Sequence, residues 1–169
     1  MEVKLIVNGK EFSIGSQILE SISSGINDHA NYQALMEAMA EAGNVQVRRN
    51  LAYKDNINER TVEILSEKYD AETMRNLFRN KTFKETASQD LIDKMIELGD
   101  YEILENLAGS VGEFTQIEGE AVMGKLAKHP EPGIRKALVS NFHVPKSLKK
   151  NMLKDSDPDV VIAAMQGIE

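Results

Sequence analysis

One recurring pattern accounts for most of this 169-residue chain. It consists of an apolar pair beside a basic residue, then a leucine and a turn that contains asparagine, followed by an amphipathic stretch of helical period. Its centres lie at residues 49, 75, 105, 136 and 162, so the period is 26 to 31 residues. Two short helices per unit at such a period are typical of a solenoid, in which each unit buries its apolar face only against its neighbours. We therefore expect helical repeats over residues 43–169.

Capping residues support this period. Amphipathic runs that follow good N-cap side chains predict helices over residues 59–68, 71–79 and 89–98, after Asn58, Asp70 and Ser88. Pro145 and Pro158 suit the first position of a helix, because proline lacks an N–H group that this position does not need. We expect Asp157 to cap the helix that begins at Pro158.

The first 42 residues do not follow the repeat. Apolar and polar residues alternate on both sides of Asn8-Gly9, a dipeptide that favours a type I′ turn, so we predict a β-hairpin over residues 2–14. Two helices should follow, one over residues 17–23 and one that begins at Asn27 or Asp28 and ends before Gly43. A lone hairpin is marginal in water, so we expect it to pack on the helices. The predicted organisation is one compact domain in which residues 1–42 cap the array of residues 43–169.

The last units carry a pattern seen in a known family. Residues 128–169 contain Ile134-Arg135, then Leu138, Asn141 and a turn with Pro145, and later Asp157-Pro158; the chain here resembles leucine-rich-repeat-variant units, whose pattern is an Asp-Pro-rich turn, Val-Arg, Leu, Asn and a second turn with Pro. The resemblance is fair over residues 43–68 and poor over residues 69–127, where the Asp-Pro turn is missing. It implies a mostly α fold, a right-handed HEAT-like solenoid of short helices, and it implies no particular activity.

Composition excludes several classes of protein. The chain has no cysteine, which rules out disulfides, thiolate metal sites and a cysteine nucleophile and favours a reducing compartment. No apolar run approaches the length of a membrane span, and the apolar run at the N-terminus is too short for a signal-peptide core. We expect a cytoplasmic protein without a membrane partner.

No motif in the sequence indicates catalysis. The three histidines, His29, His129 and His143, do not have metal-ligand spacing, and neither a Gly-x-Ser-x-Gly motif nor a phosphate-binding glycine loop with its lysine is present. We predict that the chain is not an enzyme and has no catalytic residue, metal site or cofactor.

The charge is unevenly distributed. Residues 121–154 contain eight basic residues and one acidic residue, whereas the whole chain has a formal charge of −7. This basic strip suits either an acidic protein surface or the phosphates of nucleic acid. The acidic remainder could conversely imitate a nucleic-acid backbone. Our candidate partner-binding residues in the strip are Arg135, Lys136, Lys146, Lys149 and Lys150.

These observations predict a non-enzymatic repeat protein that binds a macromolecule through its solenoid surface. We favour a protein partner, because the negative net charge opposes general nucleic-acid binding, and keep a nucleic-acid-binding module as the alternative. Arg48, Arg75 and Arg135, at related places in the repeat, are expected to bond carbonyls and carboxylates of the adjacent turn. The apolar C-terminal helix over residues 160–168 predicts self-association, because the end of an array exposes apolar surface.

Overall fold

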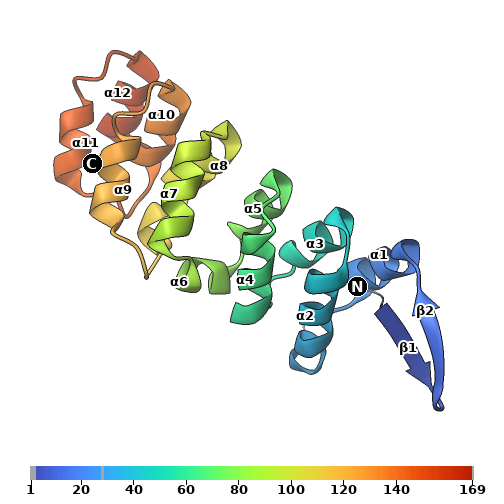
Figure 1. Ribbon diagram of the computed structural model, residues 1–169. Coiled ribbons are helices and arrows are strands. Elements are labelled where there is room, and N and C mark those ends of the chain that lie inside the picture. Colours follow the sequence, from blue (N-terminus) through green and yellow to red (C-terminus); the bar gives the residue numbers. More distant parts are fainter. Residues whose placement is uncertain (1–2, 28, 169) are drawn as a thin grey trace. The chain divides into compact units, whose positions relative to one another are not determined.

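The computed structural model describes residues 3–27 and 29–168 (Figure 1). The chain is mostly helical and begins with a two-stranded hairpin, as predicted. It divides into an N-terminal unit that ends at Phe83 and a C-terminal unit that begins at Lys84, within α6 (Lys81–Thr86). Within the described residues, no helix combines the length and the apolar content that crossing a bilayer requires.

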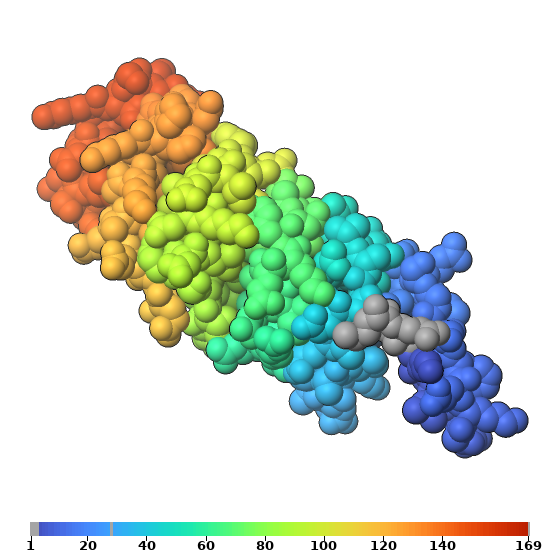
Figure 2. Space-filling model, viewed as in Figure 1, coloured from blue at the N-terminus to red at the C-terminus, as the bar shows by residue number. Residues whose placement is uncertain are grey.

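The hairpin pairs β1 (Val3–Val7) with β2 (Lys10–Ile14) in antiparallel register, with Leu5 opposite Phe12. Asn8 and Gly9 have φ angles of 51° and 73°, the positive values that a type I′ turn requires. The Phe12 side chain is 52% exposed, and Leu5 and Val7 on the same face are also about half exposed. Figure 2 shows hairpin side chains, in dark blue, projecting into solvent. The expected packing of this face on the helices is therefore not seen.

The N-terminal unit places its helices in two rows. Helices α1, α3 and α5 pack in sequence and form the first-helix row, and α2 packs against α4 in the second-helix row (Figure 1). A short 3-10 helix, η1 (Ala30–Tyr32), leads into α2, so α2 begins later than the predicted start at Asn27; Asp28 lies outside the described residues. The helices are α1 (Ser16–Gly25), α2 (Gln33–Ala42), α3 (Val45–Ala52), α4 (Glu59–Glu67) and α5 (Ala71–Leu77).

The C-terminal unit repeats this arrangement. Helices α8, α10 and α12 pack in sequence and form its first-helix row, while α7, α9 and α11 form its second-helix row and contact the first row (Figure 1). Alternate helices thus share a layer, and the core lies between the two layers. The helices are α7 (Gln89–Leu98), α8 (Tyr101–Ser110), η2 (Val111–Glu113), α9 (Gly119–Leu126), α10 (Pro132–Ser140), α11 (Lys146–Met152) and α12 (Pro158–Gln166).

The helix starts follow the capping residues. The side chains of Asn58, Asp70 and Ser88 accept N–H groups three residues later, as predicted, and Asp157 caps the helix that begins at Pro158. Pro145 differs from the prediction: it is the N-cap of α11, because its ψ angle of 140° is extended and helical geometry begins one residue later.

The predicted helix ends are less accurate. Helix α7 has the predicted bounds, whereas α4 and α5 end at Glu67 and Leu77, slightly before the predicted residues 68 and 79. After α5 the N–H of Arg79 donates to the carbonyl of Asn76, three residues back, so the chain has already tightened into a turn there.

Polar side chains after the first helices reach back to the preceding repeat. The amide of Asn80 donates to the carbonyl of Lys54 at 2.9 Å, and that of Asn141 donates to the carbonyl of Ala108 at 3.0 Å. Both asparagines are buried, so these bonds also satisfy polar groups that water cannot reach. The asparagine of the repeat pattern therefore joins neighbouring repeats.

Candidate interaction surfaces

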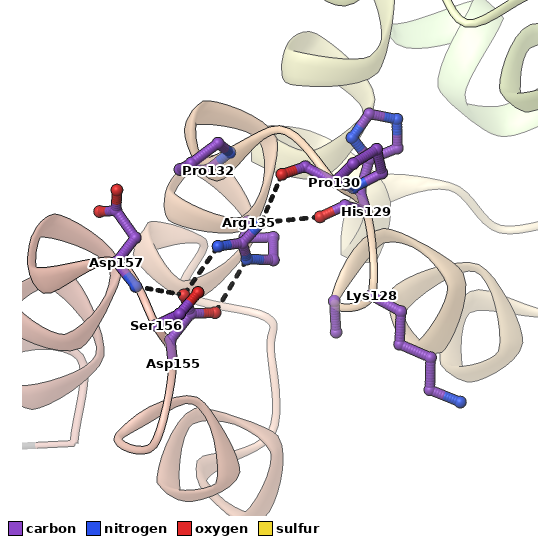
Figure 3. A pocket seen from close by; sticks show the side chains of 9 residues that line it. Lys128, His129, Pro130, Pro132, Arg135, Asp155, Ser156 and Asp157 are labelled. Atoms are coloured by element: carbon purple, nitrogen blue, oxygen red, sulfur yellow. Dashed lines mark hydrogen bonds and ion pairs between the residues drawn. The ribbon is translucent and has the colours of Figure 1, made fainter.

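Arg135 lies at the centre of a polar cluster in the C-terminal unit (Figure 3). Its Nε and Nη2 donate to the two carboxylate oxygens of Asp155 at 2.8 and 2.7 Å, and its Nη1 donates to the carbonyls of His129 and Pro130, each at 2.8 Å. The hydrogen bond from Arg135 lowers the pKa of Asp155. An open pocket of about 420 Å³ adjoins this cluster. Every nitrogen of the guanidinium is thus already bonded within the protein.

In the N-terminal unit two arginines make the kinds of contact that Arg135 alone makes in the C-terminal unit, one with a carbonyl and the other with a carboxylate. Arg48 donates to the carbonyl of Gly43, five residues back, as Arg135 does to Pro130. Arg49 holds Asp70 with two hydrogen bonds of 2.9 Å. The expected bonding to a neighbouring carbonyl is confirmed for Arg48, and bonding to both carbonyls and a carboxylate is confirmed for Arg135. Arg135 and Arg49 join one turn to the next through their aspartates.

Lys149 is buried, with only 3% of its surface exposed. It is the fourth residue after the N-cap of α11. In the other second-row helices this place is held by buried apolar residues: Met36, Val62, Ile92 and Val122. Burial, and then the charge of Lys146, lowers the pKa of the Lys149 amine. The last second-row helix therefore has a lysine where the other second-row helices have an apolar side chain.

The amines of Lys146 and Lys149 both lie at the C-terminal end of α12. The Nζ of Lys146 donates to the carbonyl of Ile168 at 2.8 Å. A Cβ placed on Gly167 would lie 2.8 Å from the Nζ of Lys149, so the amine occupies space that a side chain at residue 167 would need. Helix α12 has no basic residue in its own last turn. The two lysines supply positive charge there, where it is favourable for the helix dipole.

The five predicted binding residues do not form one continuous strip. Arg135 and Lys149 are buried, and Lys136 lies on α10 in the first-helix row, 3.4 Å from the carboxylate of Asp159. Lys146 and Lys150 are exposed on α11, in the second-helix row. Their role in partner binding stays a prediction.

Each unit has a groove on its first-helix row. The groove of the N-terminal unit, about 320 Å³, lies on α1, α3 and α5, with Arg49 and Glu72 in its wall. The groove of the C-terminal unit, about 440 Å³, lies on α8, α10 and α12, with Lys136 and Asp159 in its wall. Arg49 pairs with Glu72 at 2.6 Å and Lys136 with Asp159 at 3.4 Å, each across 23 residues of sequence. The two grooves therefore occupy equivalent places in the repeat.

A tyrosine is exposed at each groove. Tyr53 is 61% exposed, and the guanidinium of Arg79 lies 5.0 Å from the centre of its ring. The hydroxyl of Tyr101 donates to Glu105 at 3.1 Å, a bond that raises the pKa of Tyr101. Its ring packs over Gly133, where a Cβ would collide with it. Exposed tyrosines beside hydrogen-bonding groups are typical of protein-binding sites.

Sequence reasoning missed these grooves. Tyr53 directly follows a first-row helix and Tyr101 directly follows the N-cap of another. Both positions are exposed in this architecture, so an aromatic residue at either position could have indicated an interaction surface. Within the described residues, no group of three or more His, Cys, Asp or Glu side chains is placed to hold a metal ion.

No protein-family model and no curated protein matches this sequence. A designed armadillo repeat protein is similar in structure, with a TM-score of 0.35 and 14% sequence identity over 89% of this chain and 90% of that chain. Similarity at this level assigns neither a family nor a function.

Proposed function

We propose that this chain is a non-enzymatic repeat protein, of the leucine-rich-repeat-variant or HEAT-like class, that binds segments of protein partners on the first-helix row of each unit. The observation that carries this proposal is the recurrence of a groove at equivalent places in both units. A partner segment bound in either groove would meet an exposed tyrosine and an ion pair.

The groove chemistry favours protein over other ligands. The walls combine an exposed aromatic ring with charged and amide groups, such as Arg49 and Asn50 in one groove and Lys136 and Glu105 in the other. Tyrosine and arginine carry much of the binding energy of protein interfaces. The groove of the C-terminal unit also contains Asp157 and Asp159, which would repel a phosphate backbone.

The test compares binding partners of groove variants. Tagged wild-type protein, Tyr53→Ala and Tyr101→Ala would be crosslinked in lysate, and the captured proteins would be quantified by mass spectrometry. Tyr32→Ala is the matched control, because Tyr32 is exposed but lines neither groove. We expect at least one captured protein to be lost from a groove variant and kept by the control.

Two results would contradict this function. One is a set of captured proteins that neither groove variant changes. The other is tight, salt-sensitive binding of duplex or single-stranded DNA by the intact protein, lost in Lys150→Glu and unchanged in Tyr101→Ala; it would support the nucleic-acid alternative instead.

A further inference from the structure

The second-helix row of the C-terminal unit has a separate groove of about 300 Å³ between α9 and α11. Met123, which is nearly buried, and the half-buried Leu148 give the groove an apolar floor. Pro145, Ser147 and Asn151 extend its wall on the α11 side, and Glu120 and Gly124 lie on the α9 side.

A row of lysines runs beside this groove. Lys146, Lys150 and Lys154 are four residues apart, so on α11 and the turn that follows it they lie next to the row of Ser147 and Asn151. The sequence has no acidic residue between residues 132 and 154. Among the residues that the structure describes, Lys150 and Lys154 have no carboxylate partner, whereas Lys146 is bonded to Ile168. Like charges at this spacing are mildly destabilising, and an anionic partner would relieve them.

The loop before α11 carries an exposed aromatic residue. Phe142 is 98% exposed and lies three residues before Pro145. The loop is held in place by Asn141, whose amide donates to Ala108 and whose Oδ1 accepts the N–H of His143 at 2.9 Å. A rigid loop loses little conformational entropy when its aromatic side chain enters a partner.

We propose that the surface formed by α9, α11 and Phe142 binds an acidic, amphipathic segment of a partner protein. Apolar side chains of that segment enter the groove over Met123 and Leu148, and its carboxylates face Lys150 and Lys154. Charge complementarity selects this partner. The apolar floor favours a protein over nucleic acid, because a phosphate backbone has no apolar side chain to place there. This surface is distinct from the first-helix grooves and does not depend on the function proposed for them.

The experiment titrates the full chain with fluorescent 16-residue peptides. The probe places leucines at helical spacing among glutamates, and two matched peptides replace either all glutamates with lysine or all leucines with alanine. We expect the acidic leucine peptide to bind. Both matched peptides should bind at least about tenfold more weakly, because one loses the complementary charge and the other loses the apolar side chains.

Two variants locate the binding. A Cβ on Gly124 meets no atom within 4 Å, so Gly124→Leu places a bulky side chain in the groove without a clash at its Cβ. Gly109→Leu on α8 is the matched control, because a Cβ there also meets no atom within 4 Å and Gly109 does not line this groove. Lys150→Glu reverses one charge of the lysine row, and Lys10→Glu on the hairpin changes net charge equally. We expect Gly124→Leu and Lys150→Glu to weaken binding about tenfold and the two controls to leave it unchanged.

Several outcomes overturn the proposal. Binding of the acidic leucine peptide that survives in Gly124→Leu would show that the groove is not its site. Equal or tighter binding of the lysine peptide or of duplex DNA would show that the surface does not select acidic protein segments. Failure of the acidic leucine peptide to bind the wild-type chain would remove the proposal as well.

Discussion

Arg135 and Asp155, 20 residues apart in sequence, are joined by two parallel hydrogen bonds of 2.8 and 2.7 Å between α10 and the turn before α12. Both side chains are almost fully buried. In the N-terminal unit Arg49 holds Asp70 with the same geometry across 21 residues. An arginine of one first-row helix thus fixes the turn that begins the next.

Replacing Arg135 with alanine should destabilise the C-terminal unit by about 3 kcal/mol, because it leaves a buried carboxylate and two carbonyls without their donor. Urea unfolding followed by circular dichroism measures this change. Lys136→Ala is the control: its ion pair with Asp159 is exposed, so it should cost no more than about 1 kcal/mol. Similar losses in the two variants would contradict a structural role for Arg135.

Acid should destabilise both units through their aspartates. Hydrogen bonds from Arg135 and Arg49 lower the pKa values of Asp155 and Asp70 below their ordinary range. A lowered folded-state pKa contributes stability that is complete above the unfolded value of about 3.9 and is lost as pH falls through the folded value. Melting temperatures measured between pH 2 and pH 6 should therefore decrease as the pH is lowered below about 4. The Asp155→Asn variant should have a lower melting temperature at neutral pH, and its melting temperature should decrease less steeply with acid than that of the wild type. An equally steep decrease would argue against Asp155 as a source of the acid sensitivity.

Lys149→Met should stabilise the C-terminal unit by about 1 kcal/mol at neutral pH, because methionine restores the apolar side chain that the equivalent position of α2 has in Met36. The lowered pKa of Lys149 means that the unfolded chain binds more protons up to about pH 10.5. Stability of the wild type should therefore rise as pH approaches that value, and the variant should lack this rise. Thermal melting from pH 7 to pH 10 tests both effects. A destabilised variant would mean that the contact of Lys149 with the end of α12 stabilises the folded protein by more than the burial of its charged amine costs.

Two glycines should respond oppositely to alanine. A Cβ on Gly43 would lie 2.5 Å from the carbonyl oxygen of Met39 and from a methyl group of the buried Val47, so Gly43→Ala should cost about 1–3 kcal/mol. Gly109 lies inside α8 with open space around it, and Gly109→Ala should stabilise by about 0.5–1 kcal/mol. Chemical unfolding of the two variants measures the difference, and equal effects would contradict the packing described at Gly43.

The repeat pattern and the helix starts could be predicted because they depend on local chemistry. Asn58, Asp70 and Ser88 cap helices through bonds that reach only three residues along the chain. The exposed face of the hairpin could not be predicted, because it depends on whether a segment distant in sequence covers that face. Hydrophobic patterning shows which face of a strand is apolar and does not show whether anything covers it.

The candidate site was harder to predict than the fold. The lysines of α11 form one basic run in sequence, but Lys149 is buried and Lys150 is exposed on the helix. Comparing second-row helices from their N-caps would have shown that Lys149 holds an apolar position. The grooves arise from three helices at a time, so no single segment of sequence indicates them.

The bonds from Asn80 to Lys54 and from Asn141 to Ala108 close loops of 26 and 33 residues. Under mechanical tension such a chain should yield in small steps, since releasing one bond frees only the segment between two neighbouring repeats. Each step would lengthen the chain by at most about 90–110 Å, at roughly 3.4 Å per extended residue. Under tension, each segment between two neighbouring repeats should therefore be able to unfold and refold while the other repeats stay folded.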